Sequence, residues 1–98
     1  MTAKPETALV NAIRRELGRR GIYVVKIHGD PYQPSGEPDL LCCIRGRFVA
    51  LEVKAGDNQP TILQRHQLRL IRDAGGLAVV VWSVEQALEA IEHVRDKP

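Results

Sequence analysis

Two acidic residues and one lysine stand where neighbouring strands can bring them together. Asp39 follows Pro38 at the start of an apolar run, and Glu52 and Lys54 flank Val53 at the end of the next one. Side chains alternate across a strand, so Glu52 and Lys54 share one face, and Asp39 can reach that face from the preceding strand. Two carboxylates beside an ammonium group favour a site for a divalent cation and a phosphate.

The apolar surroundings of these acids favour a cation as their partner. An unpaired carboxylate buried between apolar strands is costly, and a bound cation relieves that cost. Mg²⁺ prefers oxygen ligands and keeps several waters, so Asp39, Glu52 and a backbone carbonyl such as that of Val53 form a suitable partial shell. Lys54 can orient an attacking water and stabilise charge on a phosphate. The alternative is an exposed Glu52–Lys54 ion pair, which would contribute little.

Apolar spacing predicts seven elements that position these residues. Helical periodicity indicates helices over residues 5–20, 60–74 and 85–94. β-rich apolar runs indicate strands over residues 22–27, 40–44, 48–53 and 77–82. Arg45-Gly46-Arg47 favours an antiparallel hairpin between the second and third strands. The order αβββαβα predicts a single α/β domain over residues 1–98, with a mixed four-stranded sheet flanked by helices on both faces.

The two later helices carry their own start and stop signals. Pro60 suits the first turn of the middle helix, and Gly75-Gly76 suit its end. Ser83 is a suitable N-cap for the last helix. The predicted inward stripe of the middle helix consists of Leu63, Leu68, Ile71 and Ala74.

Charge is distributed unevenly along the chain. The 98 residues carry 14 Lys and Arg against 12 Asp and Glu, and this net charge of +2 does not by itself indicate a nucleic-acid partner. Arginines cluster in the first helix and recur in the middle helix, where they can contact phosphates or simply form a solvated face. These arginines are Arg14, Arg15, Arg19, Arg20, Arg65, Arg69 and Arg72.

Cysteine usage, targeting motifs, chain size and histidine spacing add four further expectations. Cys42 and Cys43 are neighbours on a strand and point to opposite faces, so we interpret both as unpaired core thiols. The sequence shows no secretory signal, membrane-length apolar run or lipidation motif, which favours a reducing cytoplasm and no membrane association. A domain this small that must grip a large substrate is expected to dimerise. The three histidines lack the spacing of a zinc site.

The acidic residues and the lysine resemble the signature of a known family. Pro38-Asp39 with Glu52-Val53-Lys54 is similar to the motif of the PD-(D/E)XK nucleases, and within them to the VRR-NUC (viral replication and repair nuclease) group. The likeness covers nearly the whole chain, because the expected element order matches the family's restriction-endonuclease-like core. It implies Asp39 and Glu52 as catalytic metal ligands, the Val53 carbonyl beside them, and Lys54 as the catalytic lysine.

The resemblance also implies roles for two further polar residues. Glu6, in the first helix, would be an additional metal ligand or a nearby acid. The alternative is an acid favoured at a helix start by the helix dipole. Gln64 would be the catalytic glutamine that family members place beside the lysine, with Gln67 as a nearby competitor and a solvated helix residue as the alternative.

The activity that the resemblance implies is a Mg²⁺- or Mn²⁺-dependent DNA endonuclease. A relative of this minimal size is expected to act as a homodimer on branched DNA such as four-way (Holliday) junctions, in a bacterial or phage-infected cell. One alternative is a nuclease of the same fold that cuts flaps, ends, linear duplex or single strands. Another is a catalytically idle DNA- or partner-binding module, which leaves the acids and the lysine unexplained. The residues expected to contact DNA are Arg14, Arg15, Arg19, His28, Tyr32 and Arg65.

Overall fold

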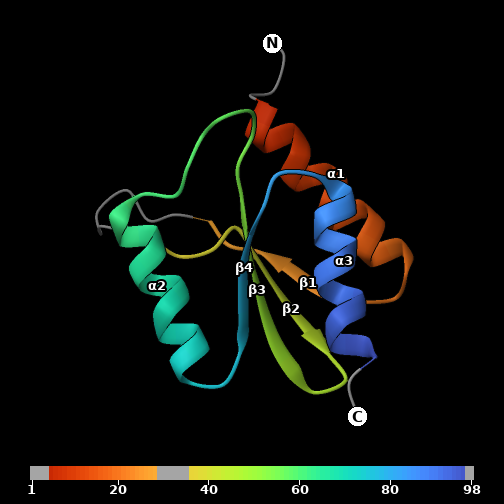
Figure 1. The fold of residues 1–98 in the computed structure, drawn as a ribbon. Helices are drawn as coiled ribbons and strands as arrows, with labels where there is room; N and C mark the ends of the chain where they lie inside the picture. Colours follow the sequence, from red (N-terminus) through yellow and green to blue (C-terminus); the bar gives the residue numbers. More distant parts are fainter. Residues whose placement is uncertain (1–4, 29–35, 97–98) are drawn as a thin grey trace.

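The computed structural model describes residues 5–28 and 36–96, in the predicted order αβββαβα (Figure 1). Its helices are α1 (Pro5–Arg19), α2 (Ile62–Asp73) and α3 (Val84–Arg95). Its strands are β1 (Tyr23–Lys26), β2 (Leu40–Ile44), β3 (Arg47–Val53) and β4 (Leu77–Val81). The predicted boundaries differ from these by at most two residues.

The described strands form one mixed sheet in the order β1-β2-β3-β4. β1 and β3 each run antiparallel to β2, whereas β4 runs parallel to β3. The predicted β2–β3 hairpin turns through Arg45 and Gly46, whose φ angles are 53° and 82°. A two-residue turn with both φ angles positive matches the twist of the strands that it joins.

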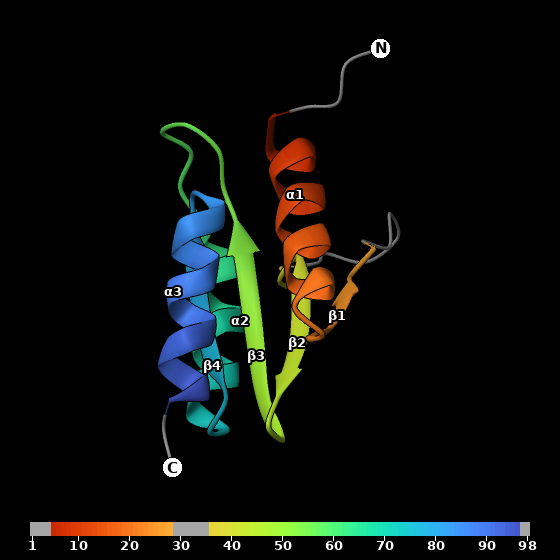
Figure 2. The same cartoon turned by 90° about the vertical axis from the view of Figure 1, so that its right-hand side faces the viewer.

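Helices α1 and α3 lie side by side on one face of the sheet (Figure 2). Their apolar stripes form the main core together with one face of every strand. The buried helix residues of this core are Val10, Ile13, Leu17, Ala87, Ile91 and Val94. The carboxyl ends of β3 and β4 point towards the end of the molecule where α1 and α3 begin (Figure 1).

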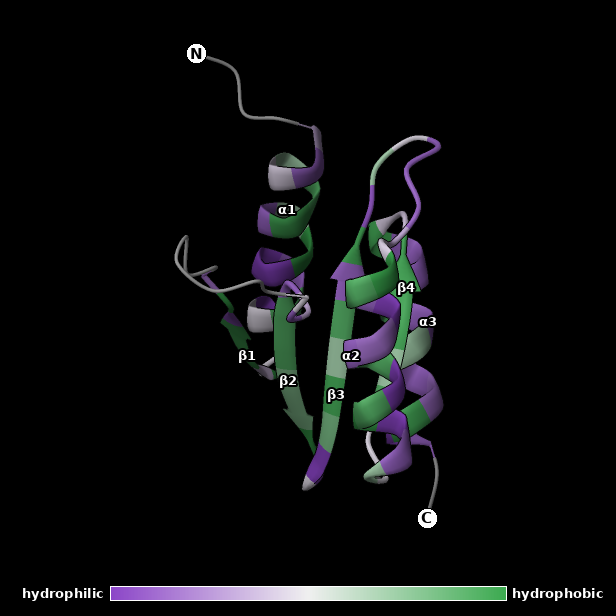
Figure 3. Cartoon of the chain, turned by 90° about the vertical axis from the view of Figure 1, so that its left-hand side faces the viewer, coloured by the Kyte–Doolittle hydropathy of each residue, from purple (hydrophilic) through white to green (hydrophobic). Residues whose placement is uncertain are grey.

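The opposite face of the sheet is covered unevenly. Helix α2 packs over β3 and β4, where Leu68 meets Ala50 and Ala78. The strand surfaces of β1 and β2 next to it carry no helix within the described residues (Figure 3). Helices therefore flank both faces, as predicted, but α2 covers only half of one.

This placement corrects the predicted inward stripe of α2. Leu68 is buried and Ile71 packs beside it, as expected. Leu63 is 39% exposed and Ala74 is also exposed, although both were expected to face the sheet. The reason is that α2 lies over one edge of the sheet, so one flank of its stripe faces the open half instead.

The two cysteines lie on opposite faces of β2 and differ in exposure. Both are free, and Cys42 is in the main core, where burial raises the pKa of its thiol to about 11. Cys43 is exposed, contrary to the expectation that both thiols lie in the core. Its face of β2 is the one that no described helix covers.

Across the described ranges, none of the helices is both long and apolar enough to cross a membrane.

Candidate active site

The strand register brings the two predicted metal ligands together. β2 and β3 pair with Leu40 opposite Leu51. Extending this register by one residue places Asp39 opposite Glu52 on the α2 face, where directly paired residues are close neighbours. The Asp39 carboxylate also accepts a hydrogen bond from the backbone N–H of Val53 at 2.7 Å. This hydrogen bond therefore connects Asp39, which precedes β2, to the end of β3.

Glu52 is a buried acid without adequate compensation. Its side chain is 1% exposed, and its Oε2 atom has no hydrogen-bond partner among the described residues. Burial, and next the adjacent Asp39 carboxylate, raise the pKa of Glu52 to about 8, while the charge of Lys54 opposes that shift. Without a bound cation, burial and the neighbouring carboxylate therefore favour the protonated form of Glu52.

Lys54 lies between two carboxylates at the end of β3. Its Nζ atom is 3.9 Å from Glu52 Oε1 and 3.7 Å from Glu6 Oε1. Both distances exceed that of a hydrogen bond, so these contacts are electrostatic. The backbone N–H of Lys54 donates to the carbonyl of Val81 at 3.0 Å, which anchors the lysine to the end of β4.

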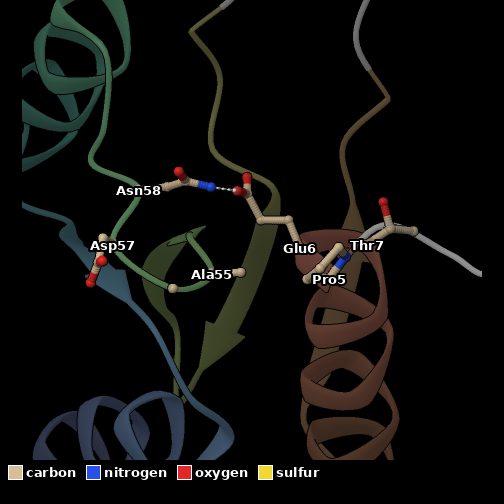
Figure 4. A pocket seen from close by; sticks show the side chains of 7 residues that line it. Pro5, Glu6, Thr7, Ala55, Asp57 and Asn58 are labelled. Carbon is tan, nitrogen blue, oxygen red and sulfur yellow. Dashed lines mark hydrogen bonds between the residues drawn. The ribbon is translucent and has the colours of Figure 1, made fainter.

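Glu6 reaches Lys54 from the first turn of α1. Figure 4 shows that Asn58, in the loop after β3, contacts the Glu6 carboxylate. The side-chain amide of Asn58 donates to Glu6 Oε2 at 3.3 Å. The indole N–H of Trp82 in turn donates to the carbonyl of Asn58 at 2.9 Å. An open pocket of about 610 Å³ lies beside this contact and is lined by the start of α1 and by residues 55–58.

Sequence reasoning missed the contribution of Asn58. Neither Asn58 nor Trp82 was singled out as a site residue in the sequence analysis. The contact joins residues 52 positions apart, which no local pattern of the sequence indicates. Glu6 is thus placed as the partner of Lys54 and Asn58, and this favours the nearby acid over the direct ligand among its two predicted roles.

The donor set fits a hard divalent cation. Among the described residues, no group of three or more His, Cys, Asp or Glu side chains could hold a metal ion. The candidate metal ligands are therefore the two carboxylates of Asp39 and Glu52. Two carboxylates suit Mg²⁺, which usually takes one or two of them and completes its shell with water and phosphate oxygens. The unpartnered Oε2 of Glu52 is the atom that such an ion would satisfy. The ligand role of the Val53 carbonyl stays a prediction.

Gln64 has a structural role, because its side chain takes part in capping the start of α2. Its Oε1 atom accepts the backbone N–H of Thr61 at 2.9 Å, while the Thr61 hydroxyl accepts the backbone N–H of Gln64 at 3.1 Å. This reciprocal pair is a capping box that starts α2. None of the hydrogen bonds between described residues joins Gln64 to Lys54, so its catalytic role stays a prediction that the geometry does not support.

The arginines of α1 differ in how they are engaged. Arg14 and Arg15 are exposed. Arg19 and Arg20 both bond the carboxylate of Glu16, with Arg19 at 2.7 Å and Arg20 at 2.9 Å. These hydrogen bonds lower the pKa of Glu16 to about 2. A phosphate would therefore compete with Glu16 for Arg19.

The remaining predicted DNA contacts lie apart from α1. Arg65 is an exposed residue of α2, and its Nε donates to the carbonyl of Pro60 at 3.3 Å. His28 is exposed just beyond β1. Tyr32 lies outside the described residues. DNA contact by each of these residues stays a prediction.

The architecture matches solved nuclease structures. A structure described as a VRR_NUC domain superposes with a TM-score of 0.76 at 29% sequence identity, covering 93% of this chain and 98% of that one. The resemblance to VRR-NUC domains and the restriction-endonuclease-like fold are thus confirmed. No protein-family model matches the sequence, and a search of curated proteins finds no significant match.

A second solved structure shares the fold at lower sequence identity. It is Hjc from Archaeoglobus fulgidus, described as a Holliday junction resolvase from an archaeal hyperthermophile. The TM-score is 0.62 at 22% identity, with 79% of this chain and 67% of that chain covered. At this identity the likeness shows the common fold alone.

Proposed function

We propose that this chain forms one nuclease domain, a Mg²⁺- or Mn²⁺-dependent DNA endonuclease that acts as a homodimer on branched DNA such as four-way junctions. The observation that carries the proposal is the buried, unpartnered Oε2 of Glu52, with Asp39 opposite it and Lys54 Nζ 3.9 Å from its other oxygen. The likeness to a VRR_NUC domain over 93% of the chain supports the nuclease assignment. The preference for branched DNA is supported by the fold shared with a Holliday junction resolvase.

Each residue of the site has a task in phosphodiester hydrolysis. Asp39 and Glu52 would hold the cation, and the Val53 N–H would keep the Asp39 carboxylate in place. A bound Mg²⁺ or Mn²⁺ would act as a Lewis acid that stabilises negative charge on the scissile phosphate. The ammonium of Lys54 would orient the attacking water and stabilise the charge that develops on the phosphate oxygens. Glu6 would keep the lysine side chain turned into the site.

Cleavage of a panel of labelled DNAs tests this function. The panel contains a four-way junction, a flap, a splayed arm and linear duplex, each with Mg²⁺, Mn²⁺ or chelator. We expect metal-dependent cutting, fastest on the junction, that falls by about a hundredfold or more in Asp39→Ala and Lys54→Ala, because each loses a group that stabilises the transition state. Faster cutting of flaps or linear duplex would instead favour those substrates.

Glu37→Ala is the matched control, because Glu37 is an exposed carboxylate in the turn before Asp39. It should cut like the wild type. Metal-dependent cutting that survives in Asp39→Ala and Lys54→Ala protein would disprove the assigned site. Binding of DNA without any turnover would favour an idle binding module.

A further inference from the structure

Three residues from separate parts of the fold lead to the ammonium group of Lys54. The indole Nε1 of Trp82, directly after β4, donates to the carbonyl of Asn58 at 2.9 Å. The side-chain amide of Asn58 donates to Glu6 Oε2 at 3.3 Å (Figure 4). The other oxygen of that carboxylate, Oε1, is 3.7 Å from Lys54 Nζ. We call Trp82, Asn58 and Glu6 the lysine tether.

The side chain of Lys54 depends on its neighbours for its position. Its ammonium group lies 3.7 Å from Glu6 and 3.9 Å from Glu52, and neither contact is a hydrogen bond. A lysine side chain is long and flexible, so holding it in one conformation costs entropy. A cation bound at Glu52 would occupy that carboxylate. Among the described residues, Glu6 would then be the acid that balances the charge of Lys54.

Glu6 in turn is held on the side away from Lys54. Its side chain is 34% exposed and borders the open pocket between the start of α1 and residues 55–58. A carboxylate in that position can turn towards water unless a donor holds it. The amide of Asn58 is a suitable donor because it is neutral. It fixes one oxygen of Glu6 and leaves the negative charge to Lys54.

Backbone contacts fix Asn58 itself. Its N–H donates to the carbonyl of Ala55 at 3.1 Å, which closes a turn through Gly56, whose φ angle is 60°. Its carbonyl accepts the indole N–H of Trp82. The backbone N–H of Trp82 donates to Gln86 Oε1 in the first turn of α3 at 2.7 Å. The loop after β3 is therefore anchored to the end of β4 and to the start of α3.

We propose that Asn58 is a positioning residue that acts on Lys54 through Glu6. Trp82 fixes the loop that carries Asn58. The proposal rests on the proposed function for its purpose, because it identifies residues that set the position of the catalytic lysine without touching the substrate. The competing role for the exposed Asn58 side chain is a direct contact with DNA. Loss of a positioning residue lowers kcat, whereas loss of a uniform DNA contact raises KM.

Acylation of Lys54 in the metal-free, DNA-free protein tests the lysine tether independently of nuclease activity. Brief treatment with an amine-reactive reagent, followed by peptide mass spectrometry, gives the rate at Lys54 relative to Lys26, a half-buried lysine of β1. Asn58→Ala and Trp82→Phe should each raise this ratio by about threefold or more, because each removes one hydrogen bond of the tether. Gln59→Ala is the matched control, because Gln59 is the next exposed side-chain amide in the same loop. It should leave the ratio unchanged.

Double variants show whether Asn58 acts through Glu6. Glu6→Ala should raise the reactivity of Lys54 at least as much as Asn58→Ala does. In Glu6→Ala protein, Asn58→Ala should have no further effect, because the contact that it removes is already lost. Trp82 is the single tryptophan of the chain, so its fluorescence reports the position of the loop. Asn58→Ala keeps the backbone carbonyl that Trp82 bonds, so the emission spectrum and the thermal unfolding midpoint should not shift.

Cleavage kinetics on the DNA that the wild type cuts fastest give the functional measurement. Asn58→Ala should lower kcat by about tenfold and leave KM unchanged, because the lysine is less well placed while DNA binding is retained. Gln59→Ala should cut like the wild type.

Three results would overturn the inference. Asn58→Ala could leave the reactivity of Lys54 unchanged, it could raise that reactivity equally in Glu6→Ala protein, or it could raise KM without lowering kcat, which would make Asn58 a DNA contact. A protein in which Asn58 and Glu6 control the reactivity of Lys54 as expected, but which cuts no DNA, would contradict the proposed function and still support the tether. A protein whose cutting requires Lys54 but is unaffected by Asn58→Ala would do the reverse.

Discussion

At the scale of single residues, the burial of Glu52 makes the stability of the protein depend on pH. The pKa of Glu52 is raised to about 8 in the folded protein, above its ordinary value of 4.5, mainly by burial and then by Asp39. Between these two pH values the folded state binds more protons than the unfolded state. The free energy of unfolding contributed by Glu52 must therefore fall as the pH rises through that window.

Substitution of Glu52 by glutamine removes this ionisation while keeping the shape of the side chain. In chelator at pH 8, Glu52→Gln should be more stable than the wild type by up to about 4 kcal/mol. Mg²⁺ should raise the unfolding midpoint of the wild type, since it binds the ionised form, and should leave that of the variant unchanged. Denaturant unfolding at pH 5.5 and pH 8 measures both effects, with Glu37→Gln as the exposed control. A variant with the wild-type pH dependence would show that Glu52 is not the responsible group.

Individual residues also show how far the sequence predicts this site. Asp39, Glu52 and Lys54 were predictable, because strand alternation and one hairpin suffice to bring them to one face. Gln64 was assigned to catalysis, although Thr61-x-x-Gln64 also fits the capping-box pattern that the structure adopts. Asn58 was not predictable, because its contact with Glu6 depends on how α1 and a distant loop meet in space.

At the scale of elements, a close approach between backbones positions the segment that carries Asp39. A Cβ atom added at Gly36 would lie 2.7 Å from the carbonyl oxygen of Leu63, at the start of α2. Gly36→Ala should therefore push the loop away from α2, lower stability by roughly 1–3 kcal/mol and weaken stabilisation by Mg²⁺.

Gly18→Ala is the matched control, because Gly18 lies within α1 and has open space around the added atom. It should raise stability by about 0.5–1 kcal/mol, since alanine favours the helix. Denaturant unfolding with and without Mg²⁺ compares the two variants. Equal stability of both would show that the contact with Leu63 does not constrain the loop.

Helix α2 marks the limit of pattern-based prediction at this scale. Periodicity correctly identifies residues that share one side of the helix, such as Leu68 and Ile71. It does not report how much of that side the sheet covers, because coverage depends on where the crossover places α2 above the strands. Leu63 was therefore expected inside and is exposed. The element order was predictable, because each element has its own local start and stop signals.

At the scale of the whole molecule, the proposed homodimer should cut two strands of one junction with two sites related by a two-fold axis. Each copy carries one Asp39–Glu52–Lys54 site, so a dimer presents two symmetric sites to symmetric strands. A mixed dimer of one wild-type copy and one Lys54→Ala copy retains a single competent site. We expect it to bind a four-way junction like the wild type and to convert it mainly into a singly nicked product.

The mixed dimer can be isolated after co-expression of the two copies with different affinity tags. A differently tagged wild-type pair is the control and should give paired cuts on opposing strands. Strand-resolved gels of a junction with a separate label on each strand distinguish nicked from fully resolved products. If the mixed dimer gives paired cuts as often as the control, the two strands are cut by one site in succession, and two-fold symmetry of the dimer is not the basis of junction cleavage.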